Sequence, residues 1–287
     1  MIKRFLAVSA AAAIVGVAVV FAIGWALAAP VQTHVGKPPE DLGARAVEIK
    51  SNSGATVHGW WCPTTTSRGA VLLLPGIRAN RLSMVDRARF LRGAGYSVLL
   101  IDFQATGETK GDHITFGWKE SGDVLGAVDF VHGAAPSNDV AIIGSSLGGV
   151  AALLATPPLK VDGLVLEAVY PTIEIATRNR LENYLGRFGR MLTPLAMKQM
   201  QWRLGVSSAQ LRPVDHIADV KCPMLIMSGE KDRRTTPADT QILFERARSP
   251  KQLWFVPNAG HVDLHRTARE KYETRVLAFL QHMAESR

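Results

Sequence analysis

Short apolar runs that alternate with segments of helical spacing constrain the fold of this chain more than any other feature. From residue 69 onward, the predicted strands are GAVLLLPG, YSVLLIDF, DVAIIG, VDGLVLEAV, PMLIMSGE and QLWFVP. The predicted helices cover residues 81–93, 118–131, 146–155, 237–247 and 262–283. Upstream of them, RAVEIKS and TVHGWWC predict a hairpin of two further strands.

This alternation indicates an α/β fold with a doubly wound, mostly parallel sheet and helices on both faces. Near-continuous apolar runs are typical of strands that are buried on both faces. In such a sheet the functional side chains gather at the carboxyl ends of the strands. Residues with chemical function are therefore expected at those strand ends.

The N-terminal segment, residues 1–29, predicts a helix of a different kind. Its apolar run begins at Phe5 and contains Ser9 as its only polar side chain. At about 1.5 Å per residue, such a helix is longer than the ~30 Å hydrocarbon core of a bilayer. Lys3 and Arg4 precede the run, so the positive-inside rule places the N-terminus in the cytoplasm. This pattern favours a membrane anchor, with the rest of the chain exported to the periplasmic or extracellular side.

The alternative is a signal peptide that is cleaved after Ala26-Leu27-Ala28, which has the small-residue pattern of a cleavage site. Cleavage would release the protein, and both interpretations export the residues that follow the apolar run. Residues 30–43, rich in proline, glycine and charge, predict a linker. The remaining residues, 44–287, predict one domain.

One insertion, at about residues 170–213, breaks the alternation of strands and helices. It is rich in arginine, and its apolar residues suggest helices. We expect this segment to form a small helical cap over the carboxyl edge of the sheet. Its apolar residues suit an apolar ligand, and its arginines suit either an anionic head group or ordinary solvation.

The charge and the cysteine content exclude few classes of protein function. The chain of 287 residues has a net charge of +8, but no RNA-binding signature and no zinc-finger spacing, so we expect no nucleic-acid partner. Cys62 and Cys222 are too few to make a disulfide framework. The sequence leaves the oligomeric state open.

The segment GSSLGG, which begins at Gly144, carries the strongest chemical signal. A nucleophile elbow needs Gly-x-Ser-x-Gly on a sharp turn between a strand and a helix. Gly144 and Gly148 flank Ser146 at that spacing, whereas the corresponding neighbours of Ser145 are not glycine. Ser146 is therefore the candidate nucleophile.

A serine nucleophile needs a general base, and the base needs an orienting acid. Two later strands each lead to a suitable residue: LIMSGEKD ends at Asp232, and WFVPNAGH ends at His261. Glu230 and Asp239 compete for the role of the acid, and His265 competes for that of the base. The segment HVDLH has valine where a zinc protease has glutamate, so we expect no metal and no cofactor.

With these residues, the chain resembles the α/β-hydrolases of the serine esterase, lipase and aminopeptidase-like type. The matching pieces are LLLPG, VLLIDF, GSSLGG, CPMLIMSGEKD and NAGH. The resemblance implies an oxyanion hole formed by the backbone N–H groups of Leu147 and of Ile77. It also implies a structural role for Asp102 at the end of its strand.

The resemblance implies hydrolysis of an acyl ester or thioester through an acyl-enzyme intermediate, with a small acyl compound as substrate. Acyl transfer or peptide cleavage would use the same residues. A membrane-tethered binding domain that has lost turnover is the non-catalytic alternative. The presence of Ser146, Asp232 and His261 together argues against that alternative.

Overall fold

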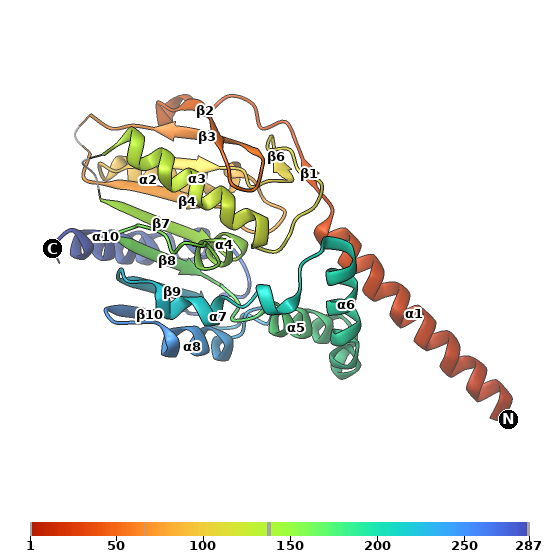
Figure 1. Ribbon diagram of the computed structural model, residues 1–287. Coiled ribbons are helices and arrows are strands. Elements are labelled where there is room, and N and C mark those ends of the chain that lie inside the picture. Colours follow the sequence, from red (N-terminus) through yellow and green to blue (C-terminus); the bar gives the residue numbers. More distant parts are fainter. Residues whose placement is uncertain (1, 66, 137–138, 286–287) are drawn as a thin grey trace.

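The computed structural model describes residues 2–65, 67–136 and 139–285, with the side chains of residues 2–13 and 284–285 outside that description. Within the described chain, a mixed sheet of eight strands forms the centre of the molecule (Figure 1). Its strands are β2 (Arg45–Lys50), β3 (Thr56–Cys62), β4 (Ala70–Leu74), β5 (Ser97–Ile101), β7 (Val140–Ser145), β8 (Gly163–Glu167), β9 (Met224–Gly229) and β10 (Lys251–Val256). The predicted strands are thereby confirmed.

The strand order is β10-β9-β8-β7-β4-β5-β3-β2. The hairpin β2–β3 is antiparallel, and β3 is antiparallel to β5, whereas every other neighbouring pair is parallel. The predicted doubly wound, mostly parallel arrangement is confirmed. Every residue of the central strands β4 and β8 is buried, as expected for strands covered on both faces.

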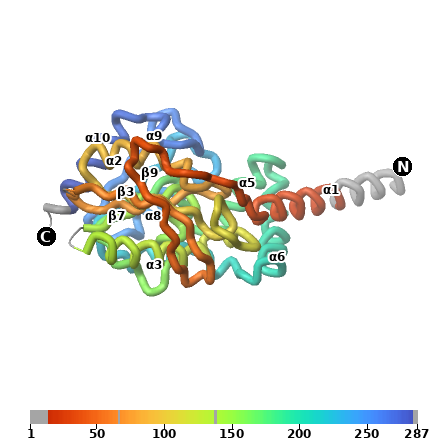
Figure 2. Tube along the Cα trace, turned by 90° about the horizontal axis from the view of Figure 1, so that it is seen from above, coloured from red at the N-terminus to blue at the C-terminus, as the bar shows by residue number. Residues whose placement is uncertain are grey.

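Helices cover both faces of the sheet. Apolar residues of α3 (Trp118–Ala134), α4 (Leu147–Leu153) and α8 (Pro237–Arg246) pack in one hydrophobic core, and those of α2 (Val85–Gly93) and α10 (Arg269–Glu285) pack in the other. Figure 2 shows α2 and α10 on one side and α3 on the other. Two predicted helices are divided: a 3₁₀ turn, η2 (Arg81–Met84), precedes α2, and the short α9 (Leu264–Thr267) precedes α10.

The insertion after β8 is helical, as expected. It contains α5 (Ile173–Leu185), the 3₁₀ segment η3 (Gly186–Leu192) and α6 (Thr193–Leu204). Thr172 caps α5, because its hydroxyl accepts from the N–H of Ile175 at 3.2 Å. Short turns, η4 (Ser208–Gln210), α7 (Pro213–His216) and η5 (Ile217–Asp219), lead from the cap back to β9.

The N-terminal helix α1 (Ile2–Ala28) packs against α6 of the cap and projects from the rest of the molecule (Figure 1). Within the described residues, no helix is both long enough and apolar enough to cross a membrane. The transmembrane helix expected over residues 1–29 is therefore not supported, and the side chains of its first part lie outside the described residues.

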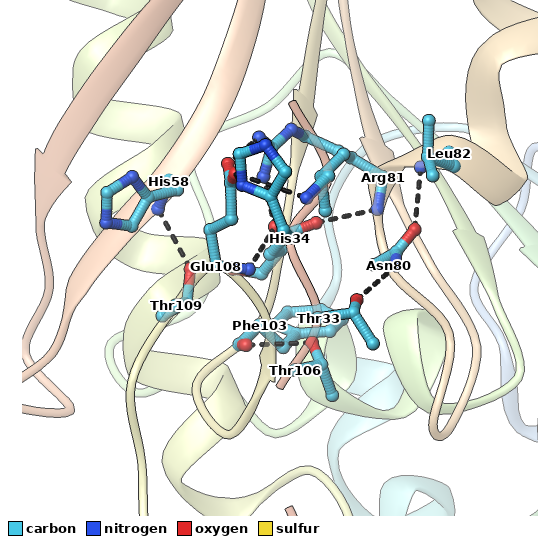
Figure 3. Close-up of polar contacts among 12 residues, drawn as sticks. Thr33, His34, His58, Asn80, Arg81, Leu82, Phe103, Thr106, Glu108 and Thr109 are labelled. Atoms are coloured by element: carbon cyan, nitrogen blue, oxygen red, sulfur yellow. Dashed lines mark hydrogen bonds and ion pairs between the residues drawn. The ribbon is translucent and has the colours of Figure 1, made fainter. Parts of the chain in front are cut away.

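The predicted linker, residues 30–43, runs along the body. Its strand β1 (Val31–Gln32) pairs in parallel with β6 (Thr106–Gly107), and a 3₁₀ turn, η1 (Glu40–Leu42), follows. Figure 3 shows the side chains that hold it: the Asn80 amide donates to the Thr33 hydroxyl at 3.2 Å, and His34 lies 3.1 Å from Glu108. The strand pairing and these contacts fix the direction in which α1 leaves the body.

Candidate active site

Ser146 lies between the end of β7 and the start of α4, as the elbow motif predicts. Its backbone has φ 48° and ψ −106°, a conformation that non-glycine residues rarely adopt. Such strained backbone conformations are concentrated at functional sites. The Ser146 N–H donates to the carbonyl oxygen of Glu167 on β8 at 2.7 Å. This bond ties the strained turn to the neighbouring strand.

Glycines around the turn permit a close approach of backbone to backbone. A Cβ added to Gly144 would lie 2.6 Å from the nitrogen of Gly149, and one added to Gly148 would lie 2.5 Å from the carbonyl oxygen of Leu74. Both distances are too short for any side chain. The strand, the turn and the helix therefore fit together only with glycine at these two positions.

Asp232 and His261 form a direct pair. His261 Nδ1 lies 2.7 Å from Oδ2 of Asp232, whose other oxygen accepts from the N–H groups of Arg234 at 2.7 Å and Thr235 at 2.9 Å. Asp232 is 2% exposed. Its carboxylate is thus fixed by two backbone donors, and it fixes the orientation of the imidazole in turn.

A single pocket brings four of the five predicted site residues together. Ser146, His261, Ile77 and Leu147 all line it, whereas Ser145 is not among its lining residues. Leu147 is the first residue of α4, so its N–H has no acceptor within that helix. Among the described contacts, no hydrogen bond joins Ser146 to His261, and such bonds often tighten only when a substrate binds.

The competing residues have other partners. Glu230 accepts from the N–H of Asn258 at 3.0 Å, and Asp239 accepts from the Asn179 amide at 2.7 Å. His265 is 1% exposed, and its Nε2 lies 2.8 Å from Glu273. Each of these contacts is structural, which leaves Asp232 and His261 as the acid–imidazole pair beside the pocket.

Asp102 supports the loop that carries Ile77. It is fully buried, accepts from the N–H of Arg81 at 2.7 Å and forms an ion pair with the Arg81 guanidinium. Arg81 also pairs with Glu108, as Figure 3 shows. Burial raises the pKa of Asp102, and the hydrogen bond and charge of Arg81 oppose that rise. The residue does not line the pocket, in keeping with the structural role implied for it.

A buried network beneath the site was not predicted. The Arg87 guanidinium lies 2.8 Å from Glu167 and 2.8 Å from Asp263, and Tyr272 also contacts Glu167. Asp263 follows His261 by two residues, and the Glu167 carbonyl accepts from Ser146. Burial raises the pKa of Asp263, but the charge and hydrogen bond of Arg87, together with the hydrogen bond from the N–H of Arg266, lower the pKa overall. Arg87 therefore connects the histidine loop to the strand that supports the serine.

Helix α1 forms one wall of the pocket. This role of the helix was also not predicted from the sequence. The wall residues recur at helical spacing, and they are Val20, Ile23, Gly24, Leu27 and Ala28. The Arg78 guanidinium, next to Ile77, donates to the carbonyl oxygens of Ala26 and Ala29 at the end of the helix. The spacing 20, 23, 24, 27, 28 was visible in the sequence, but it marks a buried stripe only once a partner surface is known.

Comparisons with known proteins agree with this architecture. Residues 71–274 match the model of the alpha/beta hydrolase family. The uncharacterized protein YqkD of Bacillus subtilis is 24% identical over 86% of this chain and 82% of its own length. The alpha/beta hydrolase domain-containing protein WAV2 of Arabidopsis thaliana is 26% identical over 82% of this chain and 78% of its own.

Two solved esterases share the fold. The Pyrococcus furiosus esterase Pf2001 superposes with a TM-score of 0.73 at 23% identity, and covers 89% of this chain and 98% of its own. The esterase EaEST of Exiguobacterium antarcticum superposes with a TM-score of 0.62 at 17% identity, and covers 83% of this chain and 100% of its own.

Proposed function

The chain belongs to the α/β-hydrolase family, and from that premise we propose that it is a serine hydrolase that cleaves an acyl ester or thioester through an acyl-enzyme intermediate. The observation that carries the proposal is the strained Ser146 in the wall of a pocket that also holds His261, itself bonded to the buried Asp232. The similarity to two solved esterases supports hydrolysis in general.

In the proposed reaction, the Ser146 hydroxyl attacks the acyl carbon while His261 accepts its proton. Asp232 holds the imidazole in the required tautomer and stabilises the imidazolium that forms. The N–H groups of Ile77 and Leu147 stabilise the negative oxygen of the tetrahedral intermediate. His261 then protonates the leaving group, and a water molecule, deprotonated by His261, releases the acyl group from Ser146.

The lining of the pocket supports an apolar acyl chain. Most of the residues beyond the reacting groups are aliphatic, and they come from α1, α5 and α6, including Val20, Leu27, Ile173, Met197 and Leu204. Apolar walls around a few fixed polar groups are typical of sites for small apolar substrates. We therefore propose a lipid-like acyl compound as the substrate.

The cellular location stays a proposal that rests on the sequence. Lys3 and Arg4 before an apolar run are typical of an export signal, which favours export of the catalytic domain. The contribution of α1 to the pocket favours retention of the helix over cleavage after Ala28. The mass of the mature N-terminal peptide, measured on protein from its native membrane and soluble fractions, distinguishes an intact chain from one that starts at Ala29.

The activity is tested with p-nitrophenyl esters of increasing acyl length and with acyl thioesters, on the full chain. We expect hydrolysis that Ser146→Ala abolishes and that Ser145→Ala leaves within about threefold. Removal of a triad nucleophile lowers kcat by up to about a millionfold, so the two variants are readily separated. Hydrolysis that persists in Ser146→Ala would contradict the proposal.

A further inference from the structure

Three arginines line the active-site pocket without an acidic partner. Arg180 lies on α5, Arg203 lies on α6, and Arg234 follows Asp232 by two residues. Within the described residues, none of the three forms an ion pair, whereas Arg190 and Arg212 of the same cap pair with Glu182 and Asp215. Two arginines of the cap are thus neutralised by carboxylates, whereas the three that line the pocket have no such partner among the described residues.

Arg180 and Arg234 are brought together by direct contacts between α5 and the loop after Asp232. The Asn179 amide donates to the carbonyl oxygen of Arg234 at 3.2 Å, and the Asn183 amide donates to that of Arg233 at 2.9 Å. Burial, and next the charge of Arg234, lower the pKa of Arg180. Two cations are therefore held close to each other, one of them partly withdrawn from water.

The hydrogen-bond donors of Arg203 are also not all paired. Its Nη1 is buried without a hydrogen-bond partner, and its guanidinium lies over the Trp25 ring of α1 at 5.5 Å from the ring centroid. A buried donor without a partner, and a cation without a counter-ion, both destabilise a fold unless a ligand completes them. All three residues line the pocket that holds Ser146.

We propose that these arginines form an anion subsite, and that the substrate of this hydrolase carries a carboxylate, sulfate or phosphate group in addition to its apolar acyl part. This inference rests on the proposed function, since it concerns the same pocket. Guanidinium groups bind such anions through paired, charge-assisted hydrogen bonds. The wall from α1 contacts the apolar part of the substrate while Arg180 and Arg234 bind its charged group.

The anion can reside on either side of the scissile bond, so the test uses two matched pairs of substrates. The p-nitrophenyl half-ester of glutaric acid, compared with p-nitrophenyl pentanoate, places the charge on the acyl side. The butanoate ester of 4-hydroxybenzenesulfonate, compared with phenyl butanoate, places it on the leaving group. The quantity measured is the ratio of kcat/KM for the anionic and the neutral member of each pair, on the full chain.

We expect the ratio in one pair to fall by at least about tenfold in Arg180→Gln and in Arg234→Gln, because each loses a charge-assisted hydrogen bond. Arg187→Gln is the matched control: Arg187 lies on the same cap outside the pocket-lining residues, so both ratios stay unchanged. Thermal unfolding of each variant identifies any that fails to fold.

Ratios that do not change in either pair for Arg180→Gln and Arg234→Gln would overturn the anion subsite. Hydrolysis of the neutral esters distinguishes this result from a failure of the proposed function. If the neutral esters are hydrolysed in a Ser146-dependent manner, the function stands and the subsite alone is wrong; if they are hydrolysed equally by Ser146→Ala, the function itself is wrong.

Discussion

At the scale of single residues, Ser146 shows how much local geometry a nucleophile elbow requires. The positive φ of this residue is tolerated because Gly144 and Gly148 let β7, the turn and α4 approach one another without side chains. The strain presents the hydroxyl to the pocket, at the N-terminal end of a helix. Ser145, its neighbour, completes the strand and pairs with Glu167 across the sheet.

Gly144→Ala therefore removes activity. Its new methyl group would lie 2.6 Å from a backbone nitrogen, so the elbow must shift, and we expect kcat/KM to fall at least about a hundredfold. Gly133→Ala is the matched control, because a Cβ there meets nothing within 4 Å in α3. We expect it to retain activity and to raise stability by about 0.5–1 kcal/mol. Equal activities of the two variants would contradict this account of the turn.

Asp123 gives the fold a pH dependence that is independent of catalysis. It is buried and accepts from Ser51 and Ser53 at 2.5 and 2.6 Å, and burial raises its pKa to about 6. A raised carboxyl pKa means that the folded state favours the proton. The stabilising contribution of this group is therefore largest below about pH 4 and is lost as the pH rises through about 6.

Asp123→Asn cannot ionise and is expected to escape that loss. Relative to the wild type, the variant should gain stability on the order of 1–3 kcal/mol between pH 4 and pH 7. Urea unfolding at several pH values measures the difference. A difference that stays constant over that range, or that changes in the opposite direction, would show that Asp123 has an ordinary pKa.

At the scale of elements, the buried Arg87 on α2 joins β8 to the loop that carries His261. Arg87→Met leaves Glu167 buried without its cation, so we expect a loss of about 3–5 kcal/mol. The exposed Arg89 on the same helix pairs with Asp41 and Asp86, and Arg89→Met should cost below about 1 kcal/mol. Adding Glu167→Gln to Arg87→Met should recover part of the loss. Chemical unfolding of the four proteins tests this prediction.

Helix α1 should set the acyl-chain range of the pocket. Leu27→Trp adds bulk to its inner face, so we expect kcat/KM for long-chain esters to fall about tenfold, with a smaller effect on short-chain esters. Ala22→Trp, on the exposed side of the same helix, is the control. An identical chain-length profile in Leu27→Trp and the wild type would mean that the acyl chain lies elsewhere.

The sequence predicts features that follow local patterns, such as the strands, and not features that depend on contacts between distant segments, such as the Arg87 network and the position of α1. The strand ends, Ser146, Asp232 and His261 follow local patterns, namely apolar runs, glycine spacing and chain order. Arg87, Glu167 and Asp263 come from three distant segments, and no local pattern pairs them. An apolar run such as residues 5–29 looks alike whether it faces lipid or protein, so the wall that α1 contributes to the pocket was not predictable.

At the scale of the whole molecule, the pocket joins segments from nearly the full length of the chain. Segments at the edge of the sheet supply Ser146 and His261, the cap supplies arginines and aliphatic side chains, and α1 closes one side. The β1–β6 pairing, with Arg78 at the end of α1, holds that helix against the body. Helix α1 and the hydrolase-fold domain therefore line one pocket together.

The proposed function depends on Ser146 being an activated nucleophile in this pocket. The most direct test is to label the full chain with a fluorophosphonate and to locate the modified residue by mass spectrometry, with Ser146→Ala and Ser145→Ala in parallel. We expect modification of Ser146 that survives Ser145→Ala and disappears in Ser146→Ala. Modification of Ser145, or a folded protein in which neither serine reacts, would contradict it.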